Sequence, residues 1–156
     1  MKALYPGTFD PVTYGHIDLI KRALLIFDEI VIGVAQISPK ETLFSLEERV
    51  GFLEQTLKDK ESIQVRSFSS LAIDFARELG TTVLIRGLRM VSDFEYEFQM
   101  ALTNRKLAPE IETIFLMPKE DYSYISSSLL KQISRTGGDV SSFVPPEVEQ
   151  ALKKKA

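Results

Sequence analysis

The chain has 156 residues, of which 44% are hydrophobic and 26% are charged, and this length fits one domain around one hydrophobic core. Its net charge of −3 argues against a binder of long nucleic acid, and the lack of cysteine excludes disulfides, thiolate metal sites and cysteine nucleophiles. No apolar run approaches the roughly 20 residues that span a bilayer, and the opening MKALYP does not resemble a secretory signal. We therefore expect a cytoplasmic protein of one domain, residues 1–156, with no membrane contact.

Short apolar runs alternate with helical patterns along the chain. Helical spacing is clearest in two sets of apolar residues, Ile17, Ile20, Leu24 and Phe27, and then Leu46, Val50, Leu53 and Leu57. The five predicted strands are Ala3–Tyr5, Ile30–Ala35, Ile63–Phe68, Thr82–Arg86 and Thr113–Met117. This alternation is typical of βαβ units. It predicts an α/β fold, a single Rossmann-like domain with a five-stranded parallel sheet and helices on both faces.

Local signals predict where several helices begin and end. Ser45 precedes Glu48, and Ser92 precedes Glu95, at the spacing of a capping box. The pair Gly137–Gly138 should end a helix that begins near Ser126, because glycine adopts the backbone conformation that closes helices. Pro145 and Pro146 suit the first turn of a last helix.

The predicted helix Ser92–Leu107 is apolar on two sides. Phe94, Phe98 and Ala101 form one stripe, whereas Tyr96, Met100 and Leu107 point elsewhere. A helix of this kind needs two surfaces to cover it. It is either a central helix of the core or a contact between subunits, and the pattern alone favours neither.

The segment GTFDPVTYGH, residues 7–16, follows the first strand and ends on the only histidine of the chain. Gly7 lets the backbone approach a ligand closely, and Thr8 offers a hydroxyl and an N–H group. His16 falls at the start of a helix, where free N–H groups and the dipole favour anions. The segment is thus a candidate phosphate site. The alternative is a turn-rich loop whose histidine merely caps the helix.

Three further motifs follow predicted strands. Arg86-Gly87-Leu88-Arg89 can present two guanidinium groups to phosphate, Ser126 to Ser128 can offer hydroxyls and N–H groups to a polyphosphate, and Lys40 supplies a third cation. Each has a plain alternative: surface arginines, a helix cap and an exposed loop lysine. However, ligands in parallel α/β folds bind beyond the carboxyl ends of the strands, where the strand order reverses. The joint placement therefore predicts a site for phosphorylated ligands.

These residues resemble a known family. Thr13-Tyr14-Gly15-His16 is similar to the (T/H)xGH motif of nucleotidyltransferases, and RGLR, VSDFEYEFQMA, FLMP and ISSSLLK together resemble the bacterial phosphopantetheine adenylyltransferase family, from Tyr5 to about Val144. The resemblance implies a Rossmann-like enzyme that joins ATP and 4′-phosphopantetheine to give dephospho-coenzyme A and pyrophosphate. It also implies Mg²⁺ as cofactor and a homohexamer, a dimer of trimers, which favours the subunit-contact interpretation of helix Ser92–Leu107.

The resemblance also implies roles for individual residues. His16, Lys40 and Arg89 would be catalytic, and Glu97 would face the ribose. The residues implied to bind 4′-phosphopantetheine are Thr8, Lys40, Ala72 and Arg86. Those implied to bind ATP are Thr8, Phe9, His16, Gly87, Leu88, Arg89, Glu97, Tyr122, Ser123, Tyr124, Ile125, Ser126, Ser127 and Ser128. No residue is implied to hold the metal.

Four positions depart from the family pattern. Tyr14 stands where asparagine is usual, Glu41 where a second lysine is common, and Ser70 and Ala72 where more acidic or bulkier residues are found. They affect the details of loop 36–44 and of pantetheine packing. Two alternatives stay open, namely another small-molecule nucleotidyltransferase and a non-catalytic nucleotide-binding protein.

The implied chemistry suits a chain with one histidine. The attacking group would be the substrate's own phosphate, which is already ionised at neutral pH and needs no protein base. The protein must then bring two anions together in line and stabilise charge on the α-phosphorus. The helix dipole should keep His16 uncharged, so we expect a neutral donor to the α-phosphate.

Overall fold

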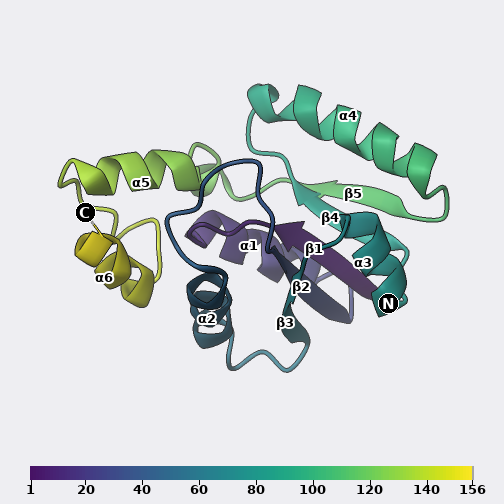
Figure 1. Ribbon diagram of the computed structural model, residues 1–156, viewed down its shortest axis with the longest axis horizontal. Helices are drawn as coiled ribbons and strands as arrows, with labels where there is room; N and C mark the ends of the chain where they lie inside the picture. The colour runs from purple at the N-terminus through teal and green to yellow at the C-terminus, as the bar shows by residue number, and fades with distance from the viewer. Residues whose placement is uncertain (156) are drawn as a thin grey trace.

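A parallel sheet in the order β3-β2-β1-β4-β5 organises the chain. The computed structural model describes residues 1–155. Its strands are Lys2–Gly7 (β1), Glu29–Ala35 (β2), Ile63–Phe68 (β3), Val83–Gly87 (β4) and Glu112–Leu116 (β5). Its helices are Tyr14–Ala23 (α1), Leu46–Thr56 (α2), Ala72–Leu79 (α3), Val91–Leu107 (α4), Ser127–Arg135 (α5) and Pro146–Lys155 (α6), with a short 3₁₀ helix at Glu120–Tyr122 (η1) (Figure 1).

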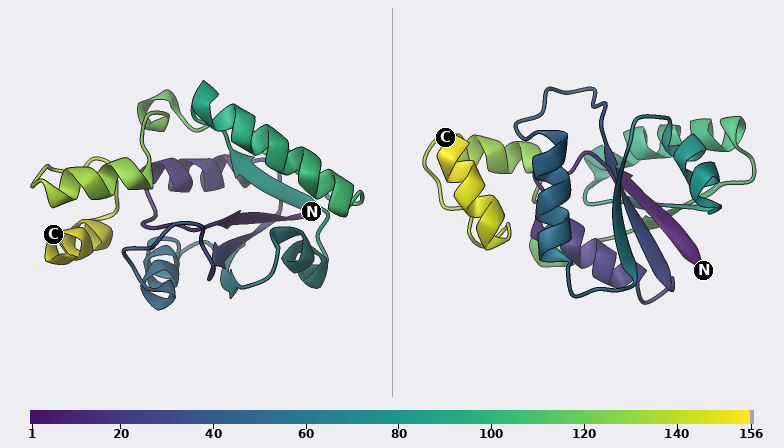
Figure 2. Two further views of the ribbon diagram at one scale, coloured as in Figure 1. Left: turned by 45° about the horizontal axis from the view of Figure 1, so that its top comes forward. Right: turned by 60° about the horizontal axis from the view of Figure 1, so that its bottom comes forward.

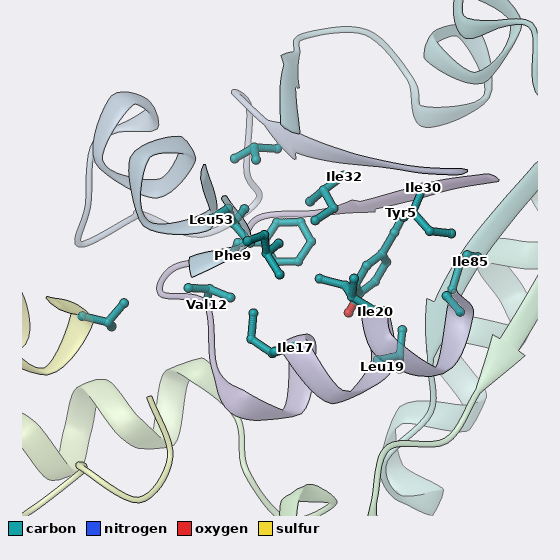
Figure 3. Packing of buried hydrophobic residues seen from close by; sticks show 14 of the residues in the cluster. Tyr5, Phe9, Val12, Ile17, Leu19, Ile20, Ile30, Ile32, Leu53 and Ile85 are labelled. Carbon is teal, nitrogen blue, oxygen red and sulfur yellow. The ribbon is translucent and has the colours of Figure 1, made fainter. Parts of the chain in front are cut away.

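Helices pack on both faces of the sheet, as predicted. Alternate side chains of each central strand point to opposite faces. Leu4, Val31 and Leu84 pack with Ile73 and Ala76 of α3 in one buried cluster. The opposite face is covered by α1, whose Ile17 and Ile20 join Tyr5, Ile32 and Ile85 in the main core (Figure 3). The Rossmann-like α/β prediction is therefore confirmed.

Backbone pairing is uneven across the sheet. β1 and β2 are paired in register over six residues, from Lys2 with Glu29 to Gly7 with Val34. β1 and β4 share a single paired position, Leu4 with Leu84. The strand order reverses between these two strands, because β2 and β3 extend the sheet on one side and β4 and β5 on the other. The sheet is thus least paired at the point where ligands bind in this class of fold.

Three of the predicted helix ends are confirmed, one of them the start of the last helix at Pro146. Ser45 and Glu48 form a reciprocal capping box at the start of α2, with each side chain bonded to the other residue's backbone N–H. α5 ends at Arg135, and Gly137 then adopts a φ of 82°, which side-chain-bearing residues rarely adopt. α1 ends at Ala23 and does not continue to Phe27.

The capping box predicted at Ser92 and Glu95 is wrong. α4 begins at Val91, with Met90 at the N-cap position and no side-chain cap. Asp93 takes over the role, because its carboxylate accepts from the backbone N–H and the guanidinium of Arg89. The helix therefore starts before Ser92.

α4 lies along the periphery of the molecule, beside β4 and β5 (Figures 1 and 2). Glu97 is its only buried residue. Phe94, Tyr96 and Phe98 are each about half exposed, at 52%, 58% and 49%. The interpretation of this segment as a central core helix is therefore wrong, because its aromatic side chains lie outside the core.

Among the helices of residues 1–155, none is both long and apolar enough to cross a membrane.

Candidate active site

The two candidate phosphate motifs lie on either side of the reversal point. The segment Gly7–His16 leaves the carboxyl end of β1 and enters α1, and Arg86 to Arg89 leave the carboxyl end of β4. The two strands are neighbours in the sheet. A Cβ at Gly87 would come within 2.8 Å of Leu19 Cδ1, so glycine allows β4 to approach α1 closely. The structure therefore brings these motifs together, as the sequence predicts.

His16 occupies the third position of α1 and completes a capping box with Thr13. The Thr13 backbone N–H donates to His16 Nδ1 at 3.0 Å, and the His16 backbone N–H donates to Thr13 Oγ1 at 3.3 Å. A backbone N–H only donates, so Nδ1 of a neutral imidazole must be the acceptor and Nε2 must carry the proton. Capping and ligand binding are thus not exclusive alternatives, because the cap fixes the ring with a donor at Nε2.

The neutral form of His16 is strongly favoured. Burial is the main cause, and the charges of Arg89 and Arg86 add to it, so that the pKa of His16 falls from 6.5 to about 4. The ring of Phe9, itself 3% exposed, packs edge-on against the imidazole at 5.0 Å between ring centres. The expectation of a neutral donor is met, but burial and two arginines account for it rather than the helix dipole alone.

This lowered pKa makes stability depend on pH. The unfolded chain takes up a proton at His16 near pH 6.5, whereas the folded chain does so only near pH 4. The contribution of His16 to the free energy of unfolding is therefore fully present above pH 6.5, and it is lost as the pH falls to about 4. The loss is worth about 3 kcal/mol. Urea unfolding at pH 7 and pH 4 should show this His16-linked loss in the wild type. The variant His16→Gln should lack it, although its side chain can still complete the capping box. An equal loss in both proteins would contradict the prediction.

Arg86 and Glu97 form a partly buried, two-point ion pair. Arg86 Nε and Nη2 donate to the two oxygens of Glu97 at 2.9 and 2.6 Å, and Nη1 donates to the Pro6 carbonyl at 2.8 Å. Burial lowers the pKa of Arg86, but the hydrogen bonds and the charge of Glu97 outweigh it and raise that pKa. Arg86 thus bridges β4, β1 and α4, and Glu97, predicted to face a ribose, has its carboxylate on this guanidinium.

Arg89 joins α4 to the segment before α5. Its guanidinium pairs with Asp93 at 3.2 Å, and its Nη1 donates to the Ile125 carbonyl at 2.6 Å. The RGLR motif is therefore connected directly to the ISSS motif. Leu88 donates its N–H to the Leu116 carbonyl at the end of β5, which fixes the turn between the two arginines.

The serine-rich segment is tied to the first motif. Ser127 Oγ donates to the Pro11 carbonyl at 2.7 Å, and the Ser126 hydroxyl caps α5 by accepting from the Leu129 N–H. Ser128 is exposed. An open hollow of about 800 Å³ lies beside this segment, lined by Glu120, Asp121, Tyr122, Ser123, Tyr124, Ser142 and Phe143. Three of the predicted ATP-binding residues, Tyr122 to Tyr124, thus border one hollow.

The remaining predicted residues differ in exposure. Thr8 is half-buried directly after β1, Ala72 is the first residue of α3, and Lys40 is exposed in the loop after β2. All three lie at carboxyl ends of strands. The side chain of Phe9 is in the core, packed on Tyr5 and His16, so a nucleotide could approach only its backbone.

Two buried charged residues at this edge were not predicted. Arg49, 2% exposed, donates to the carbonyls of Phe44, Thr8 and Ala35. Asp10, 5% exposed, accepts from the backbone of the loop after β2 and from Lys131. Arg49 could have been found in the sequence, because it is a charged residue within the apolar stripe of α2. Asp10 lies inside the segment Gly7–His16, where it looks like an ordinary turn residue.

Comparison with known proteins fits this geometry. The family model described as cytidylyltransferase-like matches residues 4–133. The phosphopantetheine adenylyltransferase of Methylacidiphilum infernorum is 56% identical, over 99% of this chain and 90% of its own. The chain belongs to the phosphopantetheine adenylyltransferase family. Another member, from Alkaliphilus metalliredigens, is also 56% identical, over 98% of both chains.

A solved structure supports the fold alone. Plasmodium falciparum nicotinic acid mononucleotide adenylyltransferase, complexed with NaAD, matches with a TM-score of 0.71 over 98% of this chain and 94% of its own. Its sequence is only 16% identical. The Rossmann-like arrangement of this family member is thus shared with a nucleotidyltransferase of very different sequence.

Proposed function

We propose that this enzyme transfers the adenylyl group of ATP to 4′-phosphopantetheine and releases pyrophosphate. The phosphate of 4′-phosphopantetheine attacks the α-phosphorus of ATP in line, which gives dephospho-coenzyme A. The reaction is a step of coenzyme A synthesis. The enzyme is placed in the cytoplasm, and its lack of cysteine is compatible with such a reducing compartment.

One observation carries the proposal. The motifs of His16, Arg86 and Arg89 meet at the carboxyl ends of β1 and β4, in a chain that is 56% identical to relatives named phosphopantetheine adenylyltransferase. Both arginines are near enough to lower the pKa of His16. A neutral imidazole donor near two cations is suited to stabilising charge on a phosphoryl group during transfer.

The residues have distinct tasks in the proposal. His16 Nε2 donates to the α-phosphate, and Arg89 and the serine segment 126–128 bind the polyphosphate. Thr8, Lys40 and Arg86 bind the acceptor phosphate, and Ala72 contacts the pantetheine arm. No protein group removes a proton, because the acceptor phosphate is already ionised. Positioning of two anions supplies most of the acceleration, about 7–11 kcal/mol in favourable cases.

Magnesium fits as a companion of ATP rather than as a metal held by the protein. Within residues 1–155, no group of three or more His, Asp or Glu side chains converges to hold a metal ion. Bound to the triphosphate, Mg²⁺ would neutralise charge on its oxygens. This chain's own contribution would be the cations and N–H groups that orient the ATP.

We also propose that the enzyme is a homohexamer, a dimer of trimers, with α4 in a subunit contact. The support is the exposure of Phe94, Tyr96 and Phe98 on a peripheral helix. Light scattering on the purified protein measures the assembly directly. A monomer at micromolar concentration would contradict this part of the proposal.

The proposal is tested by mixing purified enzyme, ATP, Mg²⁺ and 4′-phosphopantetheine and measuring pyrophosphate. We expect stoichiometric release of pyrophosphate and dephospho-coenzyme A. Nicotinamide mononucleotide and phosphocholine serve as alternative acceptors. Faster release with either of them, or ATP binding without any release, would contradict the proposal.

Lys40 should contribute to catalysis through its charge alone. We expect Lys40→Ala to lower kcat/KM for 4′-phosphopantetheine by about a hundredfold, because one cation aimed at the reacting phosphates is lost. The fold should be unaffected, since the side chain is exposed. Steady-state pyrophosphate release measures the effect. Glu41→Ala, at the neighbouring exposed position, is the control and should stay within about twofold.

A further inference from the structure

The loop that carries Lys40 is anchored by buried charges from outside the loop. Residues 36–45 connect β2 to α2 and form a long arch at the edge of the sheet (Figure 1). Within the arch, the Lys40 N–H donates to Ser38 Oγ at 3.3 Å, and both residues are accessible to solvent. The arch has no helix or strand of its own between Ala35 and Leu46. Its shape therefore depends on what holds its ends.

Asp10 holds the carboxyl-terminal end of the arch. Its two oxygens accept from the backbone N–H groups of Leu43 and Phe44, both at 2.9 Å. Lys131 of α5 donates to the same carboxylate at 2.8 Å. The Asp10 side chain is 5% exposed and that of Lys131 16% exposed, so water cannot readily replace either partner.

Arg49 closes the base of the arch. Its Nη1 donates to the Ala35 carbonyl at 2.8 Å, just before the arch, and its Nε donates to the Phe44 carbonyl at 3.2 Å, near its end. The same Nη1 reaches the Thr8 carbonyl at 2.9 Å. Both ends of the arch are thus bonded to one guanidinium, which also contacts the first phosphate motif.

We propose that Asp10 is a positioning residue for Lys40. The inference rests on the proposed function, in which Lys40 binds the reacting phosphates. Leu43 and Phe44 follow Lys40 by only three and four residues. If their N–H groups turned away, a buried carboxylate would lose two of its three hydrogen bonds. Asp10 therefore restricts the arch, and with it the Lys40 backbone, to one place beside the segment Gly7–His16.

The chemistry of the carboxylate makes the variant Asp10→Asn informative. An ionised carboxylate only accepts, and all three of its partners donate. An asparagine of the same shape brings an NH₂ group against a donor, so at least one anchor is lost. The variant Asp10→Asn/Lys131→Gln removes both charges together and leaves no unpaired ammonium. It is the second variant in case Asp10→Asn alone does not fold.

The test is a double-mutant cycle with Lys40→Ala. Asp10→Asn should lower kcat/KM by about tenfold or more, since small displacements of a binding group can cost up to about a hundredfold. In the Lys40→Ala background the same substitution should cause no further loss, because the group that it positions is gone. An undiminished loss in that background, or no loss in the wild type, would overturn the proposal.

A second readout follows the arch itself. Amide hydrogen exchange of Leu43 and Phe44 should become faster in Asp10→Asn, with the change confined to residues 36–45. Faster exchange throughout the chain would indicate general destabilisation and overturn the proposal. Glu147→Gln is the matched control, because Glu147 accepts from Thr56 at the other end of α2. It should alter neither kcat/KM nor the exchange of the arch.

The two proposals fail in different ways. If wild-type enzyme releases no pyrophosphate from any acceptor, the proposed function is wrong, whatever the exchange rates show. If wild-type activity is normal and Asp10→Asn acts equally with and without Lys40, only the positioning role is wrong.

Discussion

Replacement of His16 by alanine is expected to lower kcat by about two to three orders of magnitude while ATP binds almost as tightly as before. A donor aimed at charge that develops in the transition state is worth about 3–4 kcal/mol, and it contributes little to the ground state. Its cap leaves His16 with one free donor, Nε2. Rapid-quench measurement of the chemical step, beside an ATP titration by calorimetry, separates the two effects.

Glu48→Ala is the matched control for that experiment. Glu48 completes the capping box of α2 as His16 completes that of α1, and its carboxylate contacts Ser45 and Lys155 rather than a residue of the phosphate motifs. Both variants should lose roughly 1 kcal/mol of capping energy. Only His16→Ala should lose turnover. A near-normal kcat for His16→Ala would show that the histidine acts as a cap alone.

Arg86→Met is expected to cost both stability and activity. It leaves the Glu97 carboxylate, 10% exposed, without its charged partner, and it breaks the bond to the Pro6 carbonyl. Breaking a buried pair costs about 3–5 kcal/mol, and the partial exposure of Arg86 reduces this to about 2–3 kcal/mol. Urea unfolding measures the loss of stability, and pyrophosphate release with varied 4′-phosphopantetheine measures the loss of activity.

Adding Glu97→Leu to Arg86→Met should separate the two losses. The second change removes the unpaired carboxylate, and an apolar pair of similar size is often as stable as a buried ion pair. We therefore expect the double variant to recover most of the free energy of unfolding while kcat/KM stays about a hundredfold or more below wild type. Recovery of activity together with stability would assign Arg86 a purely structural task.

The fold was predictable because its signals are local and repeated. Each predicted strand matched an observed one to within about two residues, since runs such as Ile30–Ala35 are apolar throughout and bury both faces. The start of α4 was not predictable from spacing. Ser92 and Glu95 satisfy the pattern of a capping box, but Asp93 bonds to Arg89 four residues before it, Arg89 also bonds to Ile125, 36 residues away, and the helix begins at Val91.

The candidate site was predictable where a single basic or polar side chain follows the carboxyl end of a strand. His16, Arg86 and Arg89 are of this kind, and the structure brings their motifs together. The hydrogen-bond and ion-pair partners of these side chains could not be predicted. The bonds of Glu97 to Arg86, and those of Arg49 and Asp10 to backbone groups up to 41 residues away, depend on the packed chain. No pattern along the sequence encodes them.

The sparse pairing of β1 with β4 has a mechanical consequence. One register pair joins the two halves of the sheet, whereas β1 and β2 share six. Near the carboxyl ends of β1 and β4, the guanidinium of Arg86 donates to the Pro6 carbonyl. This side-chain bond replaces a backbone hydrogen bond between the two strands. A side chain that we propose to bind substrate therefore also links the two halves of the sheet. Parting them therefore breaks fewer backbone bonds than parting β1 from β2, and the Arg86 side chain supplies part of what holds the two halves together.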